Sequence, residues 1–95
     1  MRLLRTAEND FTDIVSYVAA DQPSAAAMLA ARIEKSLRHL SRNPRMGRIP
    51  EEVDLARVGY RYLVIENYLV FYVVEGRSIQ VHRILHGARH YLDLL

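Results

Sequence analysis

Tyr60-Arg61-Tyr62-Leu63-Val64-Ile65 and Tyr68-Leu69-Val70-Phe71-Tyr72-Val73-Val74 decide the fold, together with Ser78-Ile79-Gln80-Val81-His82-Arg83-Ile84-Leu85. Apolar, β-branched and aromatic residues dominate these runs, so residues 57–65, 68–75 and 78–85 predict strands. The connections Glu66-Asn67 and Gly76-Arg77 have the length of hairpin turns. The middle run is apolar on both faces, which predicts a central strand with helices against one face.

The N-terminal half has the periodicity of helices. Residues 2–5 predict a short strand, and Thr6 is a suitable N-cap for the helix that follows. The buried face of that helix is expected to hold Phe11, Ile14, Val15, Val18 and Ala19. Pro23 begins a second helix, which runs to about Arg42 and ends at Asn43-Pro44. The buried stripe of the second helix is expected to hold Ala26, Leu29, Ala30, Ile33, Leu37 and Leu40.

Together these segments predict an α+β fold with the order β-α-α-β-β-β. Helices joined by so few residues are antiparallel neighbours, so we expect a helical hairpin packed on a small antiparallel sheet. Residues 44–54 are predicted to form an irregular loop, and residues 88–95 a short helical tail. Residues 1–95 are expected to form a single domain.

The composition limits the classes of protein to which the chain can belong. With 51% hydrophobic residues it can bury a core, and without cysteine it has no disulfide and no thiolate metal ligand. The opening Met1-Arg2-Leu3-Leu4-Arg5 is too short an apolar run for a signal peptide. No stretch approaches the roughly 20 apolar residues that span a bilayer. We therefore expect a soluble, cytoplasmic protein with no membrane partner.

Basic residues are concentrated in one segment, although the net charge is only +2. Between residues 32 and 48 the single acid Glu34 accompanies these basic residues: Arg32, Lys35, Arg38, Arg42, Arg45 and Arg48. One interpretation is a solvated helix face and loop. The other is a surface for an anion, which means nucleic acid or an acidic partner protein. Arginine's planar fork suits pairing with phosphate or carboxylate, but the arginine bias does not decide between the two.

The order of elements and several motifs resemble the RelE/ParE family of toxins from bacterial type II toxin–antitoxin modules. These motifs are Asp21-Gln22-Pro23-Ser24-Ala25-Ala26, Asn43-Pro44-Arg45-Met46-Gly47-Arg48, Gly59-Tyr60-Arg61-Tyr62-Leu63, Asn67-Tyr68-Leu69-Val70-Phe71-Tyr72-Val73 and Ile84-Leu85-His86-Gly87-Ala88-Arg89. Each motif is weak by itself, but all of them in this order are specific for the family. The resemblance covers essentially the whole chain and is closer to the ParE branch than to the RelE branch.

The two branches imply different activities. RelE-like toxins are ribosome-dependent endoribonucleases that cleave mRNA, whereas ParE-like toxins inhibit DNA gyrase, arrest growth and have no known nuclease chemistry. The resemblance therefore implies a gyrase inhibitor, with the ribosome and mRNA as the alternative target. In both branches a cognate antitoxin neutralises the toxin, and the complex contacts operator DNA through the antitoxin. No cofactor is implied.

A nuclease would need a base, an acid and cations around the scissile phosphate. By resemblance, Arg89 matches the arginine that RelE-like nucleases carry after the last strand, and His90 with Tyr91 is similar to the terminal pair of the YoeB-like members. Arg61 is placed to face the same site. Leu69, however, stands where those nucleases have a strand arginine. We therefore assign no catalytic residue, and cleavage by Arg61, Arg89, His90 and Tyr91 is the alternative.

Some polar residues of this region also have purely structural interpretations. Tyr91 is expected either to pack the tail onto the sheet or to serve the target site. Arg83 is interpreted as forming an ion pair at a buried edge of the sheet, with Glu66 or Glu75 as its partner. His82 is expected to face solvent or to form a hydrogen bond across the sheet.

Binding surfaces are predicted from the positions of charged and polar residues. The expected contacts of the target lie in the arginine-rich loop and the C-terminal segment: Arg45, Arg48, His86, Arg89, His90 and Tyr91. The expected contacts of the antitoxin lie on or beside the apolar face of the hairpin: Phe11, Leu29 and Arg32. His86 and His90 have the spacing of metal ligands, but no carboxylate completes such a site, so no metal is expected. A further hypothesis is a degenerate toxin that binds its antitoxin and inhibits nothing.

Overall fold

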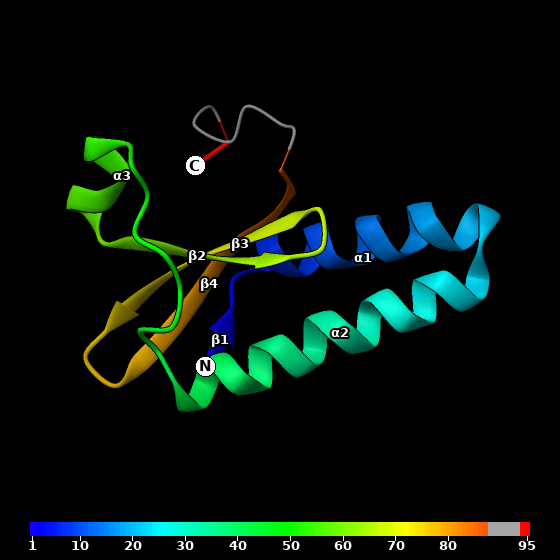
Figure 1. The fold of residues 1–95 in the computed structure, drawn as a ribbon, viewed down its shortest axis with the longest axis horizontal. Helices are drawn as coiled ribbons and strands as arrows, with labels where there is room; N and C mark the ends of the chain where they lie inside the picture. Colours follow the sequence, from blue (N-terminus) through cyan, green and yellow to red (C-terminus); the bar gives the residue numbers. More distant parts are fainter. Residues whose placement is uncertain (88–93) are drawn as a thin grey trace.

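The computed structural model describes residues 1–87 and 94–95 (Figure 1). Its elements, in chain order, are β1 (Arg2–Leu3), α1 (Arg5–Asp21), α2 (Pro23–Arg42), α3 (Val53–Val58), β2 (Tyr60–Ile65), β3 (Tyr68–Glu75) and β4 (Ser78–His86). This order confirms the predicted α+β fold and adds one short helix before β2. The predicted tail at 88–95 lies mainly outside the described residues.

The four strands form one mixed sheet in the order β1-β4-β3-β2. β4, β3 and β2 are antiparallel neighbours, as predicted, whereas β1 runs parallel to β4. β3 lies between two strands, in agreement with its two apolar faces. In each hairpin turn the first residue has a positive φ, 53° at Glu66 and 61° at Gly76. Glycine adopts this conformation freely, but Glu66 is strained there because its Cβ approaches the following carbonyl oxygen.

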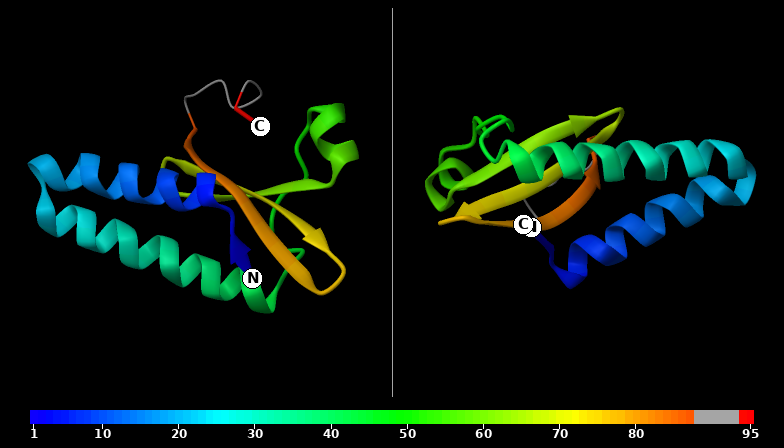
Figure 2. Two further views of the ribbon diagram at one scale, coloured as in Figure 1. Left: turned by 180° about the vertical axis from the view of Figure 1, so that it is seen from behind. Right: turned by 90° about the horizontal axis from the view of Figure 1, so that it is seen from below.

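α1 and α2 form the predicted helical hairpin, and its tip extends beyond the sheet (Figures 1 and 2). Pro23 lies in the first turn of α2, where a backbone N–H would have no hydrogen-bond partner within the helix, so proline costs nothing there. The expected N-cap at Thr6 is wrong, because α1 begins at Arg5 and the Thr6 hydroxyl donates to the carbonyl of His82 at 2.9 Å. No helix within the described residues has the length and apolar character that crossing a membrane requires.

The core lies between the helical hairpin and one face of the sheet. Its buried members are Ala7, Leu29, Ile33, Leu37, Leu40, Leu63, Ile65, Val70, Tyr72, Ile79, Val81 and Ile84. The α2 stripe is buried nearly as predicted. α1 contributes Phe11, Ile14 and Val18 only as partly buried neighbours of this core. These side chains of α1 therefore keep apolar surface that is accessible to a partner.

α3 replaces the end of the predicted loop and the start of the strand that was expected at residue 57. Asp54 lies in its first turn and Arg57 in its last, so both charges complement the helix dipole. Gly59, at a φ of 100°, ends the helix in the left-handed conformation. β2 begins at the next residue, which makes the predicted strand boundary wrong by three residues.

Aromatic rings line the face of the sheet that points away from the hairpin. Tyr60 and Tyr62 of β2 contact Phe71 of β3, with ring centroids 6.4 and 5.8 Å away. The Phe71 side chain is 1% exposed. These contacts explain the apolar residues on the second face of β3, because they give that face a small aromatic cluster of its own.

Candidate interaction surfaces

The arginine-rich segment after α2 is held in place by a tyrosine from the core. The Tyr72 hydroxyl donates to the carbonyl of Pro44 at 2.8 Å and accepts the N–H of Gly47 at 2.9 Å. Burial raises the pKa of the Tyr72 phenol, against smaller lowering effects of the Gly47 N–H and the Arg61 charge. A Cβ on Gly47 would lie 2.4 Å from the Tyr72 hydroxyl, so only glycine fits there. We call residues 44–48 the arginine loop.

Arg61 holds the same loop from β2. Its Nη1 donates to the carbonyls of Arg45 and Gly47, at 3.2 and 3.0 Å. The backbones of Arg48 and Tyr62 also pair, with N···O distances of 2.8 and 2.9 Å. Arg61 is the described member of the alternative nuclease site, and its Nη1 donates to carbonyls of the arginine loop.

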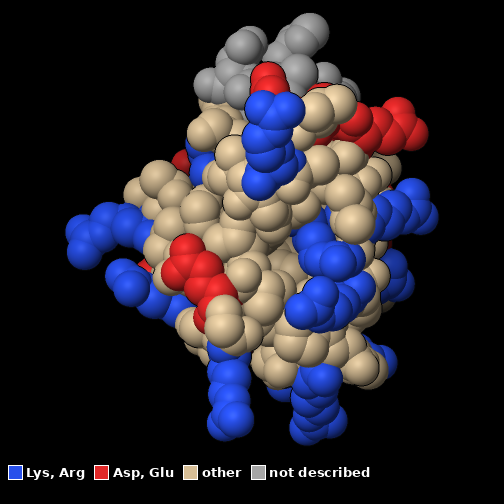
Figure 3. Space-filling model, turned by 90° about the vertical axis from the view of Figure 1, so that its left-hand side faces the viewer, with Lys and Arg blue, Asp and Glu red and all other residues tan. Residues whose placement is uncertain are grey.

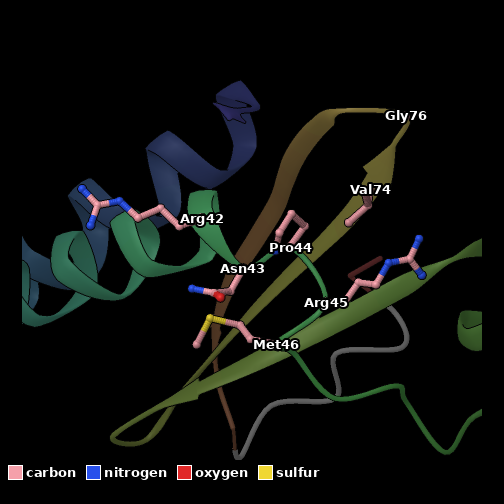
Figure 4. Close-up of a pocket in the computed structure, with 7 residues that line it drawn as sticks. All are labelled: Arg42, Asn43, Pro44, Arg45, Met46, Val74 and Gly76. Carbon is pink, nitrogen blue, oxygen red and sulfur yellow. The ribbon is translucent and has the colours of Figure 1, made fainter.

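A pocket of about 490 Å³ opens beside the arginine loop, and we call it the loop pocket. It is lined by Arg42, Asn43, Pro44, Arg45, Met46, Val74 and Gly76. Figure 4 shows Arg42 leaving the end of α2 on one side and Arg45 projecting from the loop on the other. The two guanidinium groups point away from each other, so they do not converge on a single small anion.

Basic side chains dominate the end of the molecule that carries α3, the β3–β4 turn and the C-terminal end of α2 (Figure 3). Arg45 and Arg48, both expected to contact the target, are exposed. The loop pocket has a basic hollow on each side, one lined by Lys35, Arg38, His39 and Arg42, the other by Arg45, Gly59, Arg61, Val74 and Gly76. This arrangement favours the interpretation of the segment as a surface for an anion.

The predicted C-terminal cluster can be placed only in part. His86 is exposed at the end of β4, and its ring meets that of Tyr68 edge-on at 5.5 Å. Arg89, His90 and Tyr91 lie outside the described residues. Leu69 is half-buried on β3. Among residues 1–87, 94 and 95, no group of three or more His, Asp or Glu side chains is placed to hold a metal ion.

The residues expected to contact the antitoxin fall into two separate hollows. Leu29 and Arg32 line a hollow of about 360 Å³, which we call the hairpin hollow, with Val18, Ala25, Met28, Glu66, Asn67 and Tyr68. At its rim Arg32 pairs with Glu66 at 2.6 Å. Phe11 lies in another hollow, of about 310 Å³, beside Leu3 and Leu37. The structure therefore brings Leu29 and Arg32 together and places Phe11 apart from them.

Arg83 does form an ion pair at a partly buried edge, but the predicted partners are wrong. Its Nε and Nη2 donate to the two carboxylate oxygens of Asp10, at 2.7 and 3.0 Å. Asp10 also accepts the backbone N–H of Ile84 at 3.0 Å, and Arg83 donates to the Leu94 carbonyl. The hydrogen bonds to Asp10 raise the pKa of Arg83. Asp10 and Thr6 thus satisfy backbone groups of β4 beyond the end of β1.

His82 forms the hydrogen bond across the sheet that was one of its two expected roles. Its Nδ1 lies 2.9 Å from the Tyr60 hydroxyl, and burial raises the pKa of that phenol. His82 is the extra residue of a β-bulge, since Phe71 pairs with Arg83 and Tyr72 with Val81. Its Nε2 is buried without a hydrogen-bond partner in the described part of the chain. Burial lowers the pKa of His82, and the negative charge of Glu75 partly opposes this effect.

Three residues important for these surfaces were not predicted from the sequence: Asp10, Gly47 and Tyr72. Tyr72 fits the apolar pattern of a strand, and its partners are backbone groups of a loop. Asp10 fits the polar pattern of a helix, and its partners are a distant arginine and a backbone N–H. Such partners leave no local signal in the sequence. Gly47 lies three residues after Pro44 in a loop motif. A glycine in such a loop was the only sequence signal that another side chain packs closely against the backbone.

Comparisons with known proteins agree with this architecture. Residues 1–91 match the family model described as the ParE toxin of the type II toxin–antitoxin system parDE. A solved structure, the chromosomal ParDE toxin–antitoxin system from P. aeruginosa, superimposes with a TM-score of 0.73. The alignment covers 90% of this chain and 91% of that one, at 24% sequence identity, so it shows a similar fold. A comparison with curated protein sequences found no match.

The family model spans almost the whole chain, including both helices of the hairpin and all the strands of the sheet. The fold similarity extends over 90% of the chain. The chain therefore belongs to the ParE toxin family of type II toxin–antitoxin systems.

Proposed function

We propose that the protein inhibits DNA gyrase and that a cognate antitoxin neutralises it in the cytoplasm. The observation that carries this proposal is the match to the ParE toxin family over residues 1–91. The chemistry of the described residues supports it as well. Arg61 is held by loop carbonyls, and Leu69 stands in place of the strand arginine of RelE-like nucleases. An inhibitor of this kind needs a binding surface rather than a general base and acid.

The surface that we propose for gyrase combines the arginine loop with the C-terminal segment. Arg45 and Arg48 are exposed on a loop that Tyr72 and Arg61 hold in position, so their backbone is ordered before any target binds. Preorganisation of this kind lowers the entropic cost of association. From the C-terminal segment, we propose that gyrase is also contacted by His86, Arg89, His90 and Tyr91.

The antitoxin is proposed to cover the hairpin hollow. This hollow offers apolar side chains, Leu29 and Met28, next to the exposed Arg32–Glu66 pair. Met28 is 61% exposed, so its apolar side chain is accessible to a partner. Phe11, in its separate hollow, is proposed as a second contact. Recognition of operator DNA is assigned to the antitoxin of the complex.

A titration of purified toxin into a supercoiling reaction tests the proposal. Gyrase, ATP and relaxed plasmid are mixed with increasing toxin, and the product is followed on agarose gels with and without detergent. We expect loss of supercoiling or trapped cleaved DNA near stoichiometric toxin, and reversal by an equimolar antitoxin. Unchanged supercoiling with a folded toxin in large excess would rule out gyrase as the target.

A further inference from the structure

Three adjoining hollows form a continuous row of basic side chains along one end of the molecule. The hollow on α2 shares Arg42 with the loop pocket, and the loop pocket shares Arg45, Val74 and Gly76 with the hollow beside β2. We call the basic residues of this row the basic track: Lys35, Arg38, His39, Arg42, Arg45 and Arg61. The lining residues that the structure describes include no Asp or Glu in any of these three hollows.

The charges of the track are not used within the described part of the fold. Lys35, Arg38, Arg42 and Arg45 are all exposed. The ion pairs found among the described residues, Arg32–Glu66 and Arg83–Asp10, involve none of them. Arg61 differs, because its Nη1 holds the arginine loop. A helix face and the arginine loop therefore present four exposed cations that take no part in an ion pair among the described residues.

The geometry of the track fits a linear polyanion. Lys35, Arg38 and Arg42 follow one another at i, i+3 and i+7, so they share one face of α2 over about 10 Å. Successive phosphates of one DNA strand advance about 3.4 Å along the axis, so this face spans about three of them. Arg45 continues the row from the loop, and its guanidinium points away from that of Arg42 (Figure 4). Such divergence suits successive phosphates and not one small anion.

The lining also distinguishes duplex from single-stranded nucleic acid. Proteins that bind single strands stack bases on aromatic side chains, in addition to neutralising phosphates. Among the described residues that line the three hollows there is no Phe, Tyr or Trp, and His39 carries the one aromatic ring. A surface with cations but without stacking platforms contacts the phosphate backbone and does not read bases.

We propose that this toxin binds the phosphate backbone of duplex DNA directly, without sequence preference, through Lys35, Arg38, Arg42 and Arg45. The contact is distinct from operator recognition by an antitoxin. It goes beyond gyrase inhibition and does not depend on it. If gyrase is the target, the same contact lets the toxin bind the DNA that is already bound to gyrase.

The test is the salt dependence of binding to a fluorescently labelled 20-bp duplex, followed by anisotropy with purified toxin. Four phosphate contacts predict a loss of affinity of about 150-fold between 50 and 200 mM KCl. The Arg42→Ala/Arg45→Ala variant is expected to lose only about 12-fold over the same range, because two contacts remain. The Arg42→Lys/Arg45→Lys variant keeps the charge and is expected to keep the wild-type salt dependence.

The matched control removes the same charge elsewhere. Arg2 and Arg5 are exposed and line none of the three hollows, so Arg2→Ala/Arg5→Ala is expected to bind like the wild type. An unchanged salt dependence in Arg42→Ala/Arg45→Ala, or no wild-type binding at 50 mM KCl, would overturn the proposal. So would tighter binding to a single-stranded 20-mer, or displacement of the duplex by poly-glutamate at equal charge. Gyrase is absent from this assay, so its outcome is independent of the supercoiling test.

Discussion

Replacing Tyr72 with phenylalanine should loosen the arginine loop while leaving the core filled. The change deletes one hydroxyl, which donates to Pro44 at 2.8 Å and accepts from Gly47 at 2.9 Å. Losing the bond to the Pro44 carbonyl costs about 0.5–1.5 kcal/mol, and leaving the buried Gly47 N–H without a partner costs about 1–3 kcal/mol. We expect Tyr72→Phe to lower the free energy of unfolding by about 1.5–4.5 kcal/mol, out of the roughly 5–15 kcal/mol typical of a domain.

Urea unfolding followed by circular dichroism measures this loss as a lower midpoint at an unchanged slope. Tyr62→Phe is the matched control, since Tyr62 is half-buried on the opposite face of the sheet and its ring packs on Phe71. The control should change the free energy of unfolding by less than about 0.5 kcal/mol. Equal midpoints for the two variants would refute the role of the Tyr72 hydroxyl.

A double-mutant cycle sharpens the same argument. Gly47→Ala places a Cβ 2.4 Å from the Tyr72 hydroxyl and 2.7 Å from its Cε1, so overpacking should cost about 1–3 kcal/mol by itself. In the Tyr72→Phe background the hydroxyl is gone and part of that clash disappears. The combined loss should therefore be smaller than the sum of the separate losses, whereas strict additivity would show that the two residues do not interact.

Four further expectations follow from contacts elsewhere in the fold. Asp10→Ala strands the partly buried Arg83 charge and the Ile84 N–H, so it should cost about 2–4 kcal/mol in urea unfolding; a loss below 1 kcal/mol would contradict this. Arg32→Ala breaks a pair whose side chains are 57% and 42% exposed, so it should cost less than about 1 kcal/mol, and a larger loss would show that the pair is structural. Burial lowers the pKa of His82, so the unfolded chain binds its proton first, near pH 6.5, and stability should fall on going from pH 7.5 to 5.5. His82→Gln should flatten that pH dependence of the urea midpoint, and an equally steep profile in the variant would exclude His82 as its source. Gly76→Ala, at a φ of 61°, should cost about 1–2 kcal/mol by thermal unfolding, and a neutral result would mean that the turn rearranges.

The strands were predicted well because their signals are local. β3 and β4 begin and end within about one residue of the expected limits, since two-residue turns separate runs that are rich in β-branched and aromatic side chains. The α2 stripe was equally visible, because a helix of 20 residues repeats its apolar period several times. α3 was missed because a helix of 6 residues has too few turns to show any period.

The site was harder to predict because its decisive contacts join distant parts of the chain. Asp10 and Arg83 are 73 positions apart, and Tyr72 is 25 positions from Gly47. The bulge at His82 also changes the alternation of side chains along β4, so the face of Arg83 does not follow from counting residues. Tyr72 has the pattern of a core aromatic residue. Its hydroxyl binds backbone groups of a loop, and such partners leave no trace in residue type.

The basic segment shows how far composition alone can lead. Its charge indicated either a solvated face or a surface for an anion. The positions of the side chains make the difference. The described lining residues of three adjoining hollows form a row of basic groups that includes no Asp or Glu, and this distinguishes the basic track from scattered surface charge. The sequence showed that Lys35, Arg38 and Arg42 belong to a basic segment, but it did not predict that they form a row. The junction to Arg45 depends on the loop conformation that Tyr72 and Arg61 impose.

The choice between gyrase and mRNA is the central question, and one preparation of toxin decides it in two parallel reactions. One reaction holds gyrase with relaxed plasmid, and the other holds programmed ribosomes with end-labelled mRNA. Our account predicts blocked supercoiling or trapped DNA breaks in the first reaction and intact mRNA in the second. The account would be contradicted if the toxin cleaved mRNA and left supercoiling normal, and if the Arg89→Ala/His90→Ala variant no longer cleaved the mRNA.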